Sequence, residues 1–171
     1  FNFGQTAFAG SIPSGYVRLN TSELAAPTVT DPRKYFATSL WVGTGTEGKA
    51  TRACFDSTGT AWTPDFAWIK NRSTASTDWV IADVVRGVTK NLFSNNGNIE
   101  DTGTRTTGFI EGGAVVGASN FTNKSGDNQV GYFLKAGGAV SAGNNTTGSI
   151  ATTVSAADHG GFSIATWTGN G

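Results

Sequence analysis

The strand-forming pattern of this chain is clearest in Pro64-Asp65-Phe66-Ala67-Trp68-Ile69-Lys70-Asn71. Its two aromatic residues and its lysine alternate with Ala67 and Ile69, and a period of two places the two sets on opposite faces of a β-strand. No window of the chain shows the apolar period of about 3.6 residues that marks an amphipathic helix. The pattern therefore predicts an all-β protein.

Similar short runs occupy much of the chain and are separated by turns rich in Gly and Asn. About eight strands with this punctuation indicate an antiparallel β-sandwich of the jelly-roll, concanavalin A-like kind. The expected strands are residues 35–42, 64–71, 79–85, 88–93, 108–116, 129–135, 149–154 and 161–168.

Aromatic residues divide into expected core residues and candidate ligand contacts. Trp62 and Trp79 lie near turns and polar residues, where an exposed ring can stack on a sugar. With the turn residues Asn95 and Asn96 they form the candidate carbohydrate-binding set. Seven strand aromatics are instead expected on the inner faces of two packed sheets, at Phe36, Phe66, Trp68, Phe109, Phe133, Phe162 and Trp167.

Composition restricts the class of partner. The 171 residues carry 12 basic and 12 acidic side chains, and only 14% of residues are charged. This balance argues against a nucleic-acid partner or a membrane-surface patch, and no run approaches the roughly 20 apolar residues of a membrane span. Abundant Gly, Thr, Ser and Asn are typical of exposed extracellular or virion β-structure. The chain begins with Phe and lacks Met, so we expect a piece of a longer protein.

The end of the chain repeats part of its beginning. Residues 36–45 align without gaps on residues 162–171, with Phe, Trp and both Gly coinciding. An offset of domain size predicts a tandem array of β-modules, and two ordinary aromatic strands before Gly turns are the alternative. The predicted division is 1–20 as the end of a preceding β domain or an appendage, 21–34 as a linker, 35–160 as the β-sandwich module and 161–171 as the first strand of a following module.

Catalytic and metal-binding patterns are weak. His159 is the only histidine and lies next to Asp158, whose side chain would point away from it in a strand, so a hydrolytic triad is disfavoured. Cys54 is the only cysteine, so it is expected as a buried apolar residue, and a His/Cys metal site cannot be assembled. The loops at 95–101 and 127–128 carry oxygen ligands that could take calcium, without the spaced carboxylates of a strong site. We expect no enzyme, no cofactor and no metal.

Asp83 and Arg86 form a better-defined motif. They lie three residues apart at the end of an expected strand, just before Gly87. Such a pair fixes a turn by a charge-assisted hydrogen bond. We therefore expect a structural pair, and ligand binding is the alternative.

The same residues resemble a known family. Residues 64–73 are similar to a "PDFVWIKNRS" strand of phage tail-fibre-like proteins with tandem concanavalin A-like or SPRY-like β-sandwiches. Residues 83–92 and 132–138 resemble later elements of that family, and residues 1–20 resemble the end of a SPRY-like domain that often precedes it. Ala67, Thr107 and Leu134 depart from the family pattern.

A second resemblance points to a different function. Residues 129–138 faintly resemble the Tyr-Phe-Lys-Ala-Gly strand of jelly-roll alginate lyases. Leu134 is inserted here and turns every later side chain to the other face of the sheet. A polysaccharide-degrading enzyme is therefore the least favoured hypothesis.

The tail-fibre resemblance implies a structural or adhesion module of a bacteriophage tail fibre or virion appendage. Such a module is extracellular, on the virion, and contributes to host-surface recognition or acts as a spacer. The implied partners are other virion proteins, copies of itself in a homotrimer and a host-surface glycan, with no nucleic acid and no membrane insertion. A glycan-binding, lectin-like module of a secreted or cell-surface bacterial protein is the alternative.

Overall fold

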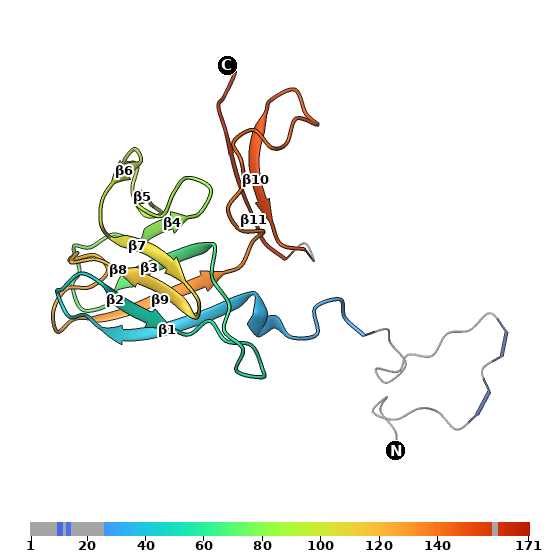
Figure 1. Cartoon of the computed structure of the whole chain (residues 1–171), viewed down its shortest axis with the longest axis horizontal. Coiled ribbons are helices and arrows are strands. Elements are labelled where there is room, and N and C mark those ends of the chain that lie inside the picture. Colours follow the sequence, from blue (N-terminus) through green and yellow to red (C-terminus); the bar gives the residue numbers. More distant parts are fainter. Residues whose placement is uncertain (1–9, 12, 15–25, 159–160) are drawn as a thin grey trace. The chain divides into compact units, whose positions relative to one another are not determined.

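Figure 1 shows a computed structural model of the chain, which describes residues 10–11, 13–14, 26–158 and 161–171. The chain divides into two compact units, Phe1–Thr30 and Asp31–Gly171. The expectations for most of residues 1–25, and for His159, lie outside the described residues. The second unit contains all the described strands, so the fold and the candidate site are both described within it.

The described residues contain no α-helix. A 3-10 turn, η2 (Pro32–Lys34), leads into the first described strand, and the Asp31 carboxylate caps it by accepting the backbone N–H of Arg33 at 3.1 Å. Every pairing between the described strands is antiparallel, which confirms the predicted fold class. The strands are β1 (Phe36–Val42), β2 (Lys49–Arg52), β3 (Phe66–Asn71), β4 (Val80–Asp83), β5 (Lys90–Phe93), β6 (Asp101–Thr102), β7 (Thr106–Ile110), β8 (Gly113–Val116), β9 (Asn128–Leu134), β10 (Thr152–Ala156) and β11 (Ser163–Trp167).

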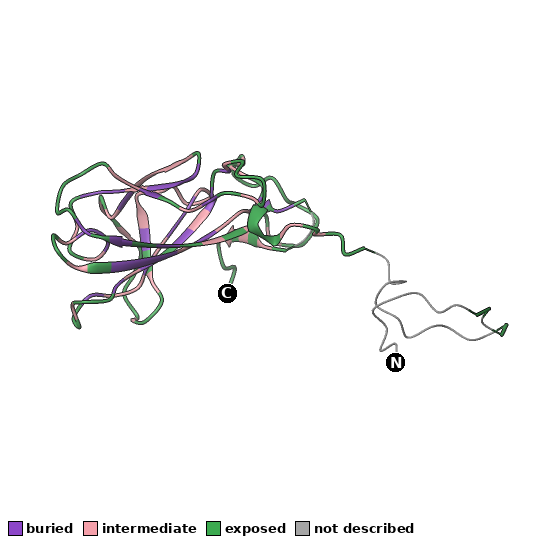
Figure 2. Ribbon diagram, turned by 90° about the horizontal axis from the view of Figure 1, so that it is seen from below, coloured by how far each residue is buried: buried purple, intermediate pink, exposed green. Residues whose placement is uncertain are grey.

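Two sheets pack together as a β-sandwich. A six-stranded sheet runs in the order β1-β9-β3-β4-β5-β6, and a three-stranded sheet runs in the order β2-β8-β7. Figure 2 shows the buried residues gathered along the strands, with the exposed ones mainly in the loops. The core residues come from both sheets and from the loops after β2: Trp41, Cys54, Trp62, Ala67, Ile69, Ala114, Val116 and Phe133.

The second strand of the larger sheet is β9, which pairs with the edge strand β1 on one side and with β3 on the other. Phe133 points into the core and is fully buried. Its neighbours across the sheet are Ala37 and Ala67, whose small side chains leave room for the ring. Large and small residues therefore alternate across the inner face, as close packing requires.

The strands differ from the expectation at several points. The run 108–116 is two strands, β7 and β8, because the chain reverses at Gly112, whose φ of +84° suits glycine. A Cβ at Gly113 would overlap the carbonyl oxygen of Thr51 on β2, so glycine also allows β8 to pair closely with β2. The short strands β2 and β6 were not expected, since neither carries an aromatic residue or a clear alternation.

The prediction that all seven strand aromatics lie in the core is wrong. Phe133 is fully buried, and Phe109 packs against the core cluster. Phe36, Trp68 and Trp167 are 48%, 36% and 64% exposed. Their positions on β1, β3 and β11 place them on faces that no described strand covers.

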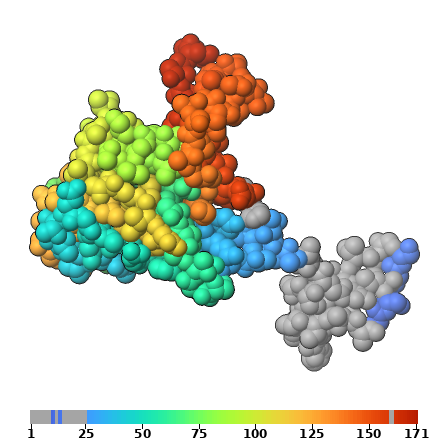
Figure 3. Space-filling view, in the orientation of Figure 1, coloured from blue at the N-terminus to red at the C-terminus, as the bar shows by residue number. Residues whose placement is uncertain are grey.

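A two-stranded hairpin, β10 and β11, completes the second unit and rises from the body of the sandwich in Figure 3. The hydroxyl of Ser155 on β10 accepts the backbone N–H of Gly137 at 3.0 Å and donates to the carbonyl of Gly138 at 2.6 Å. The ring of Phe162 meets that of Phe66 edge-on at 5.3 Å. The assignment of residues 161–171 to a following module stays a prediction. No helix that the structure describes is long and apolar enough to span a membrane.

Candidate aromatic binding site

Two adjacent rows of side chains on the outer face of the six-stranded sheet face away from the core. The register places Phe36 on β1, Leu134 on β9 and Phe66 on β3 side by side. The next row holds Thr38, Tyr132, Trp68 and Ile81 on β1, β9, β3 and β4. Neighbouring strands lie about 4.8 Å apart, so these side chains touch across the strands.

Four rings of this face form one contact cluster, and Phe66 lies beside them in the same row as Phe36. Trp79, just before β4, lies 4.7 Å from Trp68 and 6.3 Å from Tyr132 between ring centroids. Tyr132 lies 6.0 Å from Trp68 and 6.4 Å from Phe36. These separations are typical of favourable aromatic pairs. We call Phe36, Phe66, Trp68, Trp79 and Tyr132 the aromatic face.

A depression of about 420 Å³ opens on the aromatic face. None of its lining residues is charged, and Phe162 of the hairpin forms part of its wall. Small-molecule sites commonly have a volume of about 300–1,000 Å³ and mainly apolar walls, so the depression is within the usual range. The lining residues are Phe36, Phe66, Trp68, Tyr132, Leu134 and Phe162.

Polar groups surround the Trp79 end of the aromatic face. The indole Nε1 of Trp68 donates to Ser94 Oγ at 3.0 Å, which fixes the orientation of that ring. Asn95 Oδ1 accepts the backbone N–H of Trp79 at 2.8 Å, and its amide nitrogen donates to Asp78 Oδ1 at 2.7 Å. The structure therefore brings together two of the predicted carbohydrate-binding residues, Trp79 and Asn95.

The other two predicted residues lie apart from this site or have another role. Trp62 is only 8% exposed in the core, and its indole donates to the carbonyl of Arg33 at 2.7 Å. It presents no open ring face on which a sugar could stack. The side chain of Asn96 accepts the backbone N–H of Asn98 at 2.9 Å, so it holds its own turn.

Sequence reasoning missed the contribution of Trp68, Tyr132 and Phe36 to a surface. The signal was present in β3, where Trp68 shares a face with Lys70 and opposes Ala67 and Ile69. A lysine avoids the core unless it is paired, so its face of the strand is the one to expect on the outside.

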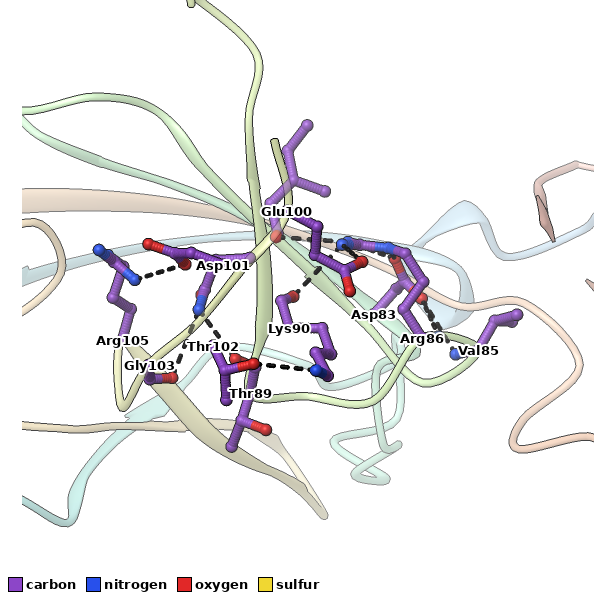
Figure 4. A network of polar contacts seen from close by, with 12 residues as sticks. Asp83, Val85, Arg86, Thr89, Lys90, Glu100, Asp101, Thr102, Gly103 and Arg105 are labelled. Atoms are coloured by element: carbon purple, nitrogen blue, oxygen red, sulfur yellow. Dashed lines mark hydrogen bonds and ion pairs between the residues drawn. The ribbon is translucent and has the colours of Figure 1, made fainter. Parts of the chain in front are cut away.

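Asp83 and Arg86 are brought together at the end of β4 (Figure 4). Arg86 Nε donates to Asp83 Oδ2 at 2.7 Å, and Nη2 of the same guanidinium forms an ion pair with that oxygen at 2.6 Å. Asp83 Oδ1 accepts the backbone N–H groups of Val85 and Arg86 at 3.0 and 2.9 Å, and Arg86 Nη1 reaches Glu100 Oε2 at 3.1 Å. The two paired side chains are only 3% and 11% exposed. The pair thus links the turn after β4 to the segment before β6.

Cys54 and the acidic residues offer no alternative site. Cys54 is fully buried, and burial raises the pKa of its thiol to about 12, so the thiolate is not populated at neutral pH. Among the described residues, no three His, Cys, Asp or Glu side chains are grouped so as to hold a metal ion. The aromatic face is therefore the strongest candidate site in the described part of the chain.

Fold and site together define an antiparallel β-sandwich with an exposed aromatic sheet face. The chain belongs to the family described as Domain of unknown function (DUF7483), whose model matches residues 31–171. That match covers the whole unit Asp31–Gly171, including every strand around the aromatic face. No curated protein and no solved structure shows significant similarity to the chain.

Proposed function

We propose that this chain is a structural and adhesion module of a bacteriophage tail fibre or other virion appendage. Its role is to present an interaction surface on the outside of the particle, within a longer protein built from several β-modules. The ordered resemblance of residues 64–73, 83–92 and 132–138 to tail-fibre-like proteins supports this assignment.

The observation that carries the proposal is the exposed outer face of the six-stranded sheet. Besides the aromatic face, β1 exposes Leu40 and Val42 there, at 67% and 56%. Contiguous apolar surface of this kind marks an interaction site, since monomeric proteins expose little of it without a function. An appendage module needs such a surface for contact with a host, with other virion proteins or with copies of itself.

The tandem arrangement is supported by a contrast between two matched tryptophans. Trp41 of β1 is buried and donates from its indole to the carbonyl of Thr122 at 3.1 Å. Its counterpart in the repeat, Trp167 of β11, is 64% exposed. We propose that β11 begins a following module in which Trp167 takes the buried place of Trp41.

Assembly into a homotrimer is part of the same proposal. Symmetric copies supply several weak contacts at once, which strengthens attachment without a larger chain. Light scattering on the intact parent protein tests this, and a strictly monomeric parent at micromolar concentration would contradict it.

The location on a virion is tested by immunogold electron microscopy. Antibodies raised against the purified chain are applied to phage particles released from cells that carry the gene. Gold on a fibre or appendage is the expected result. Particles without label, when the same lysate contains the parent protein in free form, would refute the virion assignment and favour a secreted glycan-binding module.

A further inference from the structure

We infer that the depression on the aromatic face is a carbohydrate subsite that binds a pyranose ring of a surface oligosaccharide. Its ligand would stack on Trp68 and Tyr132. The rest of the apolar wall is formed by Phe36, Phe66, Leu134 and Phe162. This inference rests on the proposed adhesion role, because the inference names the chemical class of the host-surface component that the module binds.

An apolar platform with polar groups beside it matches the chemistry of a sugar. A pyranose has an apolar face of C–H groups and an edge of hydroxyl groups, so it needs a ring platform with polar groups beside it. The platform is the set of rings whose centroids lie 4.7–6.4 Å apart around Tyr132. Sites of this type bury the ligand on apolar walls and orient it with a few polar groups.

The polar groups lie next to the platform. The hydroxyl of Tyr132 forms no hydrogen bond with any other described residue. Thr38, exposed and directly opposite Tyr132 on β1, adds a second hydroxyl. At the other end, Asp78 and Asn95 hold each other at 2.7 Å beside Trp79, and carboxylate and amide groups are common partners of sugar hydroxyls.

Concavity favours a small ligand over a second copy of the chain at this position. The hairpin bounds the depression through Phe162, whose ring meets Phe66 edge-on at 5.3 Å. A flat sheet face from another copy would have to pack across that edge, and stable interfaces need about 800 Å² from each partner. An oligosaccharide is narrow enough to enter beside the hairpin.

The rings are also held in place before a ligand arrives. The bond from the Trp68 indole to Ser94 fixes one ring, and the backbone bond from Trp79 to Asn95 fixes the segment that carries another. Preorganised side chains lose less conformational entropy on binding, which raises affinity.

The test is a titration of the purified chain with defined sugars. The probes are six-sugar oligomers of β-1,4-glucose, β-1,3-glucose and α-1,4-glucose, with a panel of purified bacterial O-antigen and capsular polysaccharides. Binding is followed by tryptophan fluorescence and by saturation-transfer NMR. The variants are Trp68→Ala and Tyr132→Phe, and the control is Leu92→Ala. Leu92 is exposed on β5 of the same sheet but does not line the depression.

We expect at least one probe to bind at millimolar concentration or below. Trp68→Ala should weaken binding by about tenfold or more, since buried aromatic contacts dominate recognition surfaces. Tyr132→Phe keeps the ring and loses the hydroxyl, so a smaller loss of about two- to tenfold is expected. Leu92→Ala should bind like the wild type, and circular dichroism should show all variants folded.

Three results would overturn the inference. They are no binding to any probe, equal weakening by Trp68→Ala and Leu92→Ala, and a wild-type dimer that Trp68→Ala dissociates, which would assign the face to a second copy. The outcome is separable from particle labelling. If virions are labelled but no sugar binds, only the proposed subsite is refuted. If a sugar binds but virions are not labelled, only the virion assignment is refuted.

Discussion

Replacing Arg86 by Met tests whether the pair that closes β4 stabilises the fold. Methionine keeps most of the apolar stem of the side chain and removes its donors. Arg86 Nε donates to Asp83 Oδ2 at 2.7 Å, Nη2 lies 2.6 Å from the same oxygen in an ion pair, and Nη2 also donates to the carbonyl of Ile81 on β4 at 3.4 Å. All of these contacts are lost in the variant.

The magnitude follows from what remains around Asp83. Its side chain is only 3% exposed, so the carboxylate would stay largely away from water without its cation. Breaking a buried ion pair in this way costs about 3–5 kcal/mol. Two backbone N–H groups still donate to the other carboxylate oxygen, at 3.0 and 2.9 Å, which places the expected loss near the lower end, about 3 kcal/mol.

Urea unfolding followed by fluorescence measures the free energy of unfolding of each variant. A loss of about 3 kcal/mol in a unit of this size corresponds to a fall of about 10 °C in Tm. The matched control is Glu100→Gln, which removes the other ion pair of Arg86. Glu100 is 38% exposed, so that change should cost less than about 1 kcal/mol.

A double-mutant cycle with Asp83→Asn separates the pair from its surroundings. The two single changes should be coupled by about 1–3 kcal/mol, since each removes the same contact. If the free energy of unfolding of Arg86→Met lies within about 1 kcal/mol of the wild-type value, the argument from burial is wrong. Normal stability together with lost surface attachment would reassign the pair to ligand binding.

Three further outcomes are expected. Phe133→Ala should lower the free energy of unfolding by about 3–5 kcal/mol in urea titration, because the fully buried ring leaves a cavity; a loss below about 1 kcal/mol would contradict the core assignment. Cys54, with a thiol pKa raised to about 12 by burial, should resist iodoacetamide at pH 8 until urea unfolds the chain, so rapid native alkylation would count against burial. The Thr74 hydroxyl, which donates to the Asp127 carboxylate, lowers the pKa of that carboxyl below 3.8. The ionised Asp127 carboxylate therefore stabilises the fold above pH 3.8, and this stabilisation is lost as the pH falls through the lowered pKa. Asp127→Asn should reduce the acid sensitivity of unfolding in that range, and an unchanged acid transition would exclude this contribution.

Part of the candidate site could be predicted from local sequence. Trp79 and Asn95 are candidates because both lie near turns, and in the structure the backbone N–H of Trp79 donates to Asn95 Oδ1 at 2.8 Å. Trp62 met the same criterion and is buried, because its indole reaches the carbonyl of Arg33, 29 residues earlier. A position near a turn therefore indicates an exposed side chain only if no segment distant in the sequence packs over it.

The sequence by itself determined the all-β class, the antiparallel pairing and most strand positions. These follow from the period of two and from turn residues, which act over a few neighbouring positions. Tertiary structure decided how the buried faces pack together. In β3 both faces carry apolar residues, so Lys70 is the only local indication of the outer face, and the inner face is completed by β9, which lies about 60 residues later and pairs with it. That pairing turns Ala67 and Ile69 inward and leaves Trp68 and Tyr132 on the outside, because only the smaller side chains fit opposite Phe133 in the closely packed core.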